Sequence, residues 1–386
     1  MSFDKHGLCV LTAGSSLAFV FGSVHAFSVF LEPLEQIFSA SRADVSLTYS
    51  IALVCITAAV TLGHRIYGLL PASGLVACIA ALGTIGAFWA GSAESLWQVW
   101  LGYGVLLGFA NGLGYGFSLQ ISAQANPGQE GLAMGVVTAA YALGATVFTF
   151  WFDAIVQRPD GFARAMRGMM IVLVILAIGA ALLLTLVRAR FKSTPTEHSE
   201  IPSISVTRII LLWLAYGCAV AAGLMATGHA IGIAMAGGVS PELLVAAPIA
   251  IAICNMVGSL CGGVLTDRLA PGPLLVGLPF VSAITLAVLA SGLLPQILIG
   301  LGVIGFIYGA VISVYPAVIA RRFGVAVGVK IYGRVFTAWA VAGLGGPWLA
   351  GWLYDSTGGY AVALMIAAGI SALSAFIAMT IRSETL

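Results

Sequence analysis

Two histidines stand inside long apolar stretches of the sequence. His25 lies in "SVHAFSVFLEPL" and His229 lies in "GLMATGHAIGIAMAGG". An imidazole ring changes its charge near neutral pH, so it can hydrogen-bond a ligand as a neutral ring or pair with an anion once it is protonated. We expect both rings to contact a small ligand or to carry a proton. The alternative for each is a structural hydrogen bond to a neighbouring backbone carbonyl.

Three pairs of polar side chains are spaced so that both members share one face of a helix. A few placed polar groups in an apolar surrounding are typical of a small-molecule site, and we expect these residues to bind the ligand. Hydrogen bonds that hold helices together are the alternative. The pairs are Asn111 with Tyr115, Asn255 with Ser259, and Tyr308 with Tyr315. For Tyr141 and Trp339, packing is favoured.

Glu32 follows His25 by seven residues and would lie on nearly the same face of an α-helix. A His25 and Glu32 pair is a candidate carrier of a coupling proton. The competing interpretation is a solvated carboxylate at a helix end, because Pro33 follows it directly.

Several functional classes are excluded by the sequence. It has no Ser, His and Asp arrangement, no Gly-rich loop before a Lys, and no HExxH, so we expect no enzyme and no catalytic residue. The six cysteines stand singly without metal-ligand spacing, and we expect no metal and no cofactor. A net charge of +2 without a basic patch argues against nucleic acid as a partner.

The elements that must position these residues are membrane helices. The chain is 60% apolar and 8% charged, whereas soluble domains carry about 25% charged residues. Apolar segments long enough to cross a hydrocarbon core of about 30 Å recur along the whole chain. We predict an all-α membrane protein with twelve transmembrane helices, embedded in a lipid bilayer. The predicted spans are 8–31, 44–63, 72–91, 97–124, 132–155, 167–188, 207–233, 243–265, 273–293, 296–320, 332–353 and 361–381.

The distribution of Lys and Arg predicts the orientation. With both termini in the cytoplasm, twelve of the sixteen basic residues lie on the inside, as the positive-inside rule requires. The four outside are Arg42, Arg158, Arg164 and Arg167. The last three either steer anions or merely flank the membrane. We expect the inner membrane of a bacterium as the location.

The two halves of the chain resemble each other. A polar stretch at 189–206 reads as a cytoplasmic linker between six-helix bundles at 1–188 and 207–386. "HAFSV" at His25 matches "HAIGI" at His229, "GFANG" at Gly108 matches "GFIYG" at Gly305, and "VVTAAYALG" matches "VFTAWAVAG". All three matches have nearly the same offset, so we predict two pseudo-symmetric bundles.

Parallel six-helix repeats are the layout of major facilitator transporters. The stretch "HAFSVFLEPLEQIFSASRADVSLTYSI" resembles the oxalate/formate antiporter family and its monocarboxylate-transporter relatives, and "YGRVFTAWAVAGLGGPWLAGWLYDSTGGY" is similar to the same family. The resemblance implies a secondary transporter of small carboxylates that works by alternating access, by exchange or with a proton. It also implies gating roles for Arg65, Asp267 and Arg268, in short cytoplasmic loops.

One position departs from the family pattern. The eighth helix of this family usually has Asn or Asp, then three residues, then an Arg that grips the substrate carboxylate. Here the segment is "NMVGSLCGG", so Asn255 is followed by Ser259 at the arginine position. A small organic anion is the expected substrate. A zwitterionic, neutral or drug-like compound, which could also be exported, is the alternative, and a sensor without transport activity is a third.

Overall fold

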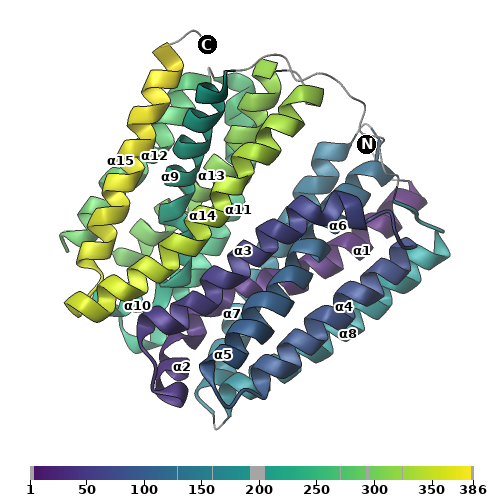
Figure 1. The fold of residues 1–386 in the computed structure, drawn as a ribbon, viewed down its shortest axis with the longest axis horizontal. Coiled ribbons are helices and arrows are strands. Elements are labelled where there is room, and N and C mark those ends of the chain that lie inside the picture. The colour runs from purple at the N-terminus through teal and green to yellow at the C-terminus, as the bar shows by residue number, and fades with distance from the viewer. Residues whose placement is uncertain are drawn as a thin grey trace. The chain divides into compact units, whose positions relative to one another are not determined.

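The computed structural model describes residues 4–127, 129–158, 160–191, 205–269, 271–292, 296–323 and 325–383, and these residues form helices and connecting turns without a strand. The chain divides into two compact units, residues 1–195 and 196–386. In Figure 1 the first is coloured purple to teal and the second teal through green to yellow. The bundle boundaries at 188 and 207 remain predictions, and residues 192–204 of the predicted linker lie outside the described residues.

The N-terminal unit contains a series of helices in which two are not of α type. Helix α4 lies alongside α8 (Figure 1), while α1 packs against α6, α7 and α8. The elements are α1 (Lys5–Phe21), the 3₁₀-helix η1 (Gly22–Phe30), α2 (Leu31–Phe38), α3 (Arg42–Ile66), α4 (Ala72–Gly91), α5 (Leu96–Val99), the π-helix η2 (Trp100–Leu107), α6 (Gly108–Ala125), α7 (Glu130–Val156) and α8 (Gly161–Leu186).

The C-terminal unit repeats this plan. Helix α12 lies alongside α15, and α9 packs against α14 and α15. The elements are α9 (Val206–Gly228), α10 (Ala230–Ala236), the 3₁₀-helix η3 (Pro241–Leu243), α11 (Ala246–Arg268), α12 (Pro271–Ala290), α13 (Ile297–Phe323), α14 (Val325–Thr357) and α15 (Ala361–Ser383).

Each of the twelve predicted spans corresponds to one helix or to a run of consecutive helices. Within the described residues, 10 helical segments are long and apolar enough to cross a membrane. The chain is therefore an integral membrane protein. The boundaries differ in places: the first span continues to Phe38, and α14 covers 33 residues where about twenty-two were predicted.

Three of the predicted spans are not continuous α-helices. The first span changes to 3₁₀ geometry at Gly22, and the fourth contains the π-helix η2. The seventh span breaks at His229, between α9 and α10. Glycine makes one of these segments possible: a Cβ on Gly102 of η2 would lie only 2.6 Å from the backbone nitrogen of Ala90 in α4.

The internal repeat is visible in how the helices cross. In the N-terminal unit α6 crosses α3 at Gly112, where a Cβ would overlap the carbonyl oxygen of Ile56. In the C-terminal unit α13 crosses α11 at Gly309, where a Cβ would overlap the carbonyl oxygen of Asn255. Small residues let membrane helices approach closely, and the same device appears at matching places in both units. Gly112 is the last residue of "GFANG" and Gly309 is the last residue of "GFIYG", the two motifs whose match indicated the repeat.

Candidate functional site

His25 lies on the 3₁₀-helix η1 and is half-buried. Its Nδ1 is 2.7 Å from the hydroxyl oxygen of Tyr49, a fully buried residue of α3. Among the residues that the structure describes, no group hydrogen-bonds Nε2 of this ring, and the ring makes no ion pair. One nitrogen is therefore anchored and the other is available.

Aromatic rings fix the orientation of His25. The ring of Tyr141, from α7, packs edge-on against it with centroids 5.5 Å apart. Tyr49 stacks on Phe27, also on η1, at 5.7 Å and with an interplanar angle of 7°. Because η1 supplies both His25 and Phe27, Tyr49 is held by its hydroxyl and by its ring.

Asn111 and Tyr115 on α6 complete this cluster in the N-terminal unit. The buried Asn111 accepts a hydrogen bond from the hydroxyl of Tyr141 at 3.3 Å. Tyr115 packs on the Tyr141 ring at 4.6 Å, and its hydroxyl is 3.3 Å from the hydroxyl of Thr138. Tyr141 contacts the three predicted binding residues of this unit, His25, Asn111 and Tyr115, although the sequence favoured packing as its role. The sequence shows Tyr141 as a polar ring in an apolar segment far from His25 along the chain. No spacing rule connects the two positions.

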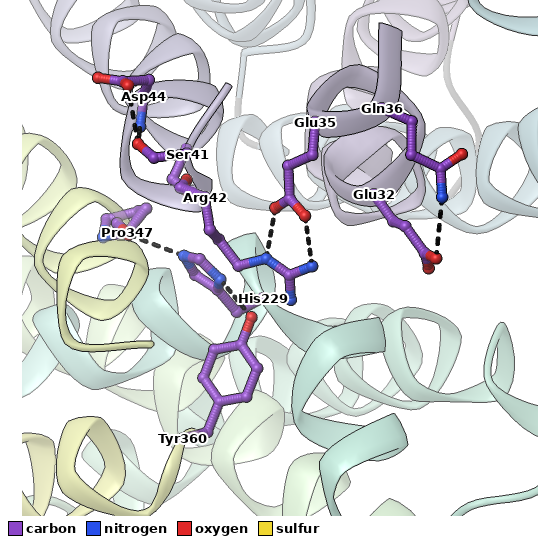
Figure 2. A network of polar contacts seen from close by, with 10 residues as sticks. Glu32, Glu35, Gln36, Ser41, Arg42, Asp44, His229, Pro347 and Tyr360 are labelled. Carbon is purple, nitrogen blue, oxygen red and sulfur yellow. Dashed lines mark hydrogen bonds and ion pairs between the residues drawn. The ribbon is translucent and has the colours of Figure 1, made fainter. Parts of the chain in front are cut away.

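His229 has a different environment. The ring is fully buried, Nε2 lies 2.7 Å from the carbonyl oxygen of Pro347 in α14, and Nδ1 lies 2.9 Å from the hydroxyl of Tyr360 (Figure 2). A carbonyl oxygen only accepts, so Nε2 carries a proton. Both nitrogens are thus engaged inside the C-terminal unit. The geometry favours the structural alternative, and ligand binding by His229 remains a prediction that would require these bonds to break.

Tyr308 occupies the place on α13 that Asn111 occupies on α6. It is buried, and its hydroxyl accepts a 2.9 Å hydrogen bond from Nε1 of Trp339 in α14. The bond between Tyr141 and Asn111 in one unit therefore has a counterpart between Trp339 and Tyr308 in the other. Tyr315 is buried against Tyr216 of α9, with ring centroids 5.0 Å apart.

Asn255 and Ser259 are half-buried neighbours on α11. The hydroxyl of Ser259 donates to the carbonyl oxygen of Gly309 at 3.2 Å and lies 3.5 Å from Oδ1 of Asn255. The position at which the resembling family carries arginine is thus occupied by a hydroxyl that bonds to α13 within the same unit.

Glu32 does not join His25. Its exposed carboxylate accepts a 3.3 Å hydrogen bond from Gln36 (Figure 2), and no bond links it to His25 in the described part of the chain. The seven-residue spacing was read on an α-helix, whereas η1 has three residues per turn, so the two side chains no longer share a face.

The predicted gating residues lie at the ends of α3 and α11. Arg65 is exposed near the end of α3. The side chains of Asp267 and Arg268 lie outside the described residues. Arg158, Arg164 and Arg167 are all exposed around the turn between α7 and α8.

An ion pair that sequence reasoning missed ties α2 to the start of α3. Nε of Arg42 is 2.5 Å from Oε1 of Glu35, and Nη2 is 2.8 Å from Oε2 (Figure 2). The chain reverses between them at Ser39, which adopts a left-handed conformation, and Ser41 caps α3. The available signal was a carboxylate and a guanidinium in the segment between the first two predicted spans.

Comparison with known proteins identifies the fold. No protein-family profile matches the chain. It is 22% identical over 333 residues to an uncharacterized MFS-type transporter, YhjX of Escherichia coli K12, covering 84% of this chain and 83% of that protein. It is 24% identical over 382 residues to the aspyridones efflux protein apdF of Emericella nidulans, covering 95% and 77%.

Solved structures of transporters have a similar fold. The nucleoside transporter NupG superposes with a TM-score of 0.74 at 13% identity, covering 98% of this chain and 99% of NupG. The inward-open, partially occluded xylose transporter XylE of E. coli superposes with a TM-score of 0.69 at 13% identity, covering 97% and 99%. The predicted major facilitator fold is confirmed, and the names of the relatives support an MFS-type transporter.

Proposed function

We propose that the protein is a secondary active transporter that moves a small, monocarboxylate-like organic anion by alternating access, coupled to a proton or by exchange. The observation that carries the proposal is the geometry of His25. One ring nitrogen is anchored by Tyr49 and the other has no partner among the described residues. An ionisable ring inside a membrane helix is costly to retain, and such groups commonly mark a substrate or proton path.

The chemistry of this ring suits a carboxylate. A protonated imidazole donates from Nε2 to an anionic oxygen, and such charge-assisted hydrogen bonds are roughly twice as strong as neutral ones. Loss of the proton removes the charge and weakens the bond. Binding of the anion and binding of the proton would therefore reinforce each other, as proton-coupled transport requires.

In this proposal the positive charge for the substrate comes from His25 and not from position 259. Ser259 has no charge and already donates to Gly309, so position 259 supplies no cation to a substrate. His25 would take that task, while Asn111, Tyr115 and Tyr141 would supply neutral polar groups. Asn255, Tyr308 and Tyr315 remain proposed substrate-binding residues.

A zwitterionic, neutral or drug-like substrate is the second candidate, favoured by the missing arginine at Ser259. Relatives and structural neighbours include proteins named for aspyridone efflux, for nucleosides and for xylose. A proton:xylose symporter is among these neighbours, so proton coupling is compatible with an uncharged substrate in this fold. We further propose cytoplasmic termini, a bacterial inner membrane, and gating by Arg65, Asp267 and Arg268.

The test is thermal stabilisation of the purified full-length protein in detergent. Monocarboxylates, dicarboxylates, amino acids, amines, sugars and nucleosides are compared at one pH below and one above neutrality, because a ligand that binds the folded state raises Tm by mass action. The proposal expects stabilisation by monocarboxylates, larger at the lower pH, and its loss in His25→Gln. Stabilisation by uncharged or zwitterionic compounds alone would overturn the proposal in favour of the second candidate, and equal stabilisation of the variant by monocarboxylates would overturn the role of His25.

A further inference from the structure

We propose that Tyr49 is a positioning residue for His25: its hydroxyl holds Nδ1 so that the proton comes and goes at Nε2, the nitrogen presented to the ligand. This inference rests on the proposed function and names the group that controls its proton.

The geometry limits how Tyr49 can move. Its hydroxyl oxygen is 2.7 Å from Nδ1 of His25, and the side chain is fully buried. Its ring stacks nearly parallel to Phe27, which in turn packs on Tyr103 of η2 at 5.4 Å. The hydroxyl of Tyr103 donates to the carbonyl oxygen of Val24, one residue before His25, at 3.4 Å. The 3₁₀ turn that carries His25 is thereby clamped to α3 and η2 on both sides of the ring.

A phenol oxygen can accept the hydrogen bond of Nδ1–H in either charge state of the ring. In the imidazolium, Nδ1–H donates to Tyr49 and Nε2–H is left for an anion. When Nε2 gives up its proton, the bond from Nδ1–H to Tyr49 persists, and the lone pair of Nε2 stays where the proton was. The ring therefore exchanges one proton at one atom without turning over.

The titratable groups that face η1 do not supply a competing charge. In the described part of the chain they are the phenols of Tyr49 from α3, Tyr141 from α7 and Tyr103 from η2. The ring makes no ion pair there. The hydroxyl of Tyr49 is thus the group that distinguishes the two ring nitrogens.

The C-terminal unit offers a matched control. His229 also bonds a tyrosine through Nδ1, at 2.9 Å from Tyr360, but its Nε2 donates to the carbonyl oxygen of Pro347. The proton of that ring is fixed on Nε2, and Tyr360 donates to Nδ1. The inference therefore requires the two histidines to have opposite neutral tautomers, with the proton on Nδ1 in His25 and on Nε2 in His229.

The variants are Tyr49→Phe, which keeps the ring on Phe27 and removes only the hydroxyl, Tyr360→Phe, and His25→Gln. Uptake of radiolabelled formate, acetate and lactate into proteoliposomes is measured across pH with the full chain. We expect Tyr49→Phe to keep its Tm within a few degrees of the wild-type value. Its KM should rise about threefold to tenfold, because one hydrogen bond is lost. The pH midpoint of uptake should also move. Tyr360→Phe should lower Tm and leave that midpoint unchanged.

The outcomes separate the two proposals. If His25→Gln abolishes the pH dependence and Tyr49→Phe matches the wild type, the positioning role is overturned and the transport proposal stands. If His25→Gln has no effect on uptake or its pH dependence, the roles of His25 and Tyr49 are overturned and carboxylate transport stands. If the wild type takes up none of these carboxylates, the transport proposal is overturned. Should Tyr49→Phe fail to fold, ¹⁵N NMR of histidine-labelled wild type decides, with His25 assigned by comparison with His25→Gln. A neutral His25 ring with its proton on Nε2 would overturn the inference, and one with its proton on Nδ1 supports it.

Discussion

The side-chain amide of Asn111 donates a 2.6 Å hydrogen bond to the carbonyl oxygen of Phe21, the last residue of α1. This bond spans 90 residues of sequence and lies at the point where α1 changes into η1. The same amide accepts from Tyr141. Asn111 therefore links α6 and α7 to the start of the irregular turn that carries His25.

Asn111→Leu should destabilise the N-terminal unit. The substitution keeps the volume but removes two hydrogen bonds, each worth about 0.6 kcal/mol on average between membrane helices, and leaves a buried carbonyl without its partner. We expect a loss of about 1 to 3 kcal/mol in the free energy of unfolding, read as a lower Tm in detergent. Thr185→Val is the control, because that exposed hydroxyl bonds only within its own helix turn. Equal Tm values for the two variants would contradict the role of Asn111.

His25→Ala and His229→Ala should have opposite consequences. Removal of His229 breaks its hydrogen bonds to the carbonyl oxygen of Pro347 and the hydroxyl of Tyr360 inside the protein and leaves a cavity, so we expect a loss of stability of about 2 to 4 kcal/mol. Removal of the half-buried His25 should change Tm by a few degrees at most, while abolishing stabilisation by carboxylates. Thermal unfolding with and without ligand measures both. A His229→Ala variant that keeps its Tm but no longer binds ligand would contradict this expectation and indicate that His229 binds the substrate.

Gly309→Ala should separate α13 from α11. A methyl group there would overlap the backbone oxygen of Asn255, which cannot move away without shifting the helix. We expect lower expression and a lower Tm. Gly369→Ala is the matched control in α15, because a Cβ there meets nothing within 4 Å and alanine favours the helix. If both variants unfold at the wild-type temperature, the close crossing is not required for stability.

The bidentate pair of Glu35 and Arg42 should contribute measurably to the N-terminal unit. The side chains are 20% and 11% exposed, between the surface case and the buried case, so we expect a coupling energy of about 1 to 2 kcal/mol. A double-mutant cycle with Glu35→Gln and Arg42→Gln, followed by thermal unfolding at low and high salt, isolates it. Additive single effects would show that the pair does not couple α2 to α3.

Patterns of residue type allowed the fold to be predicted. Apolar length predicted the spans, and the repeat of "GFANG" in "GFIYG" predicted equivalent helices. The glycines of both motifs lie at the helix crossings because only a residue without Cβ permits that distance. Periodicity detects such features since they repeat along the chain.

The site was less predictable, because its decisive contacts are not local. His25 and His229 stand in matching motifs, yet one bonds Tyr49 and the other bonds Pro347 and Tyr360, more than 100 residues further along the chain. No spacing rule connects those positions. Glu32 was placed beside His25 on the assumption of α-helical geometry, and the 3₁₀ turn that separates them has no marked sequence signal.

The π-helix η2 has a geometric consequence for the residues after it. Each of its hydrogen-bonded rings encloses one residue more than an α-helical ring. If one ring contracted to α geometry, the surplus residue would enter the following helix and turn it by about 100° relative to the segment before it. Asn111 and Tyr115 lie directly downstream on α6, whereas Tyr103 lies within η2 itself. The helical geometry of the eight residues of η2 thus determines which face of α6, and therefore which polar side chains, point toward the ring of Tyr141.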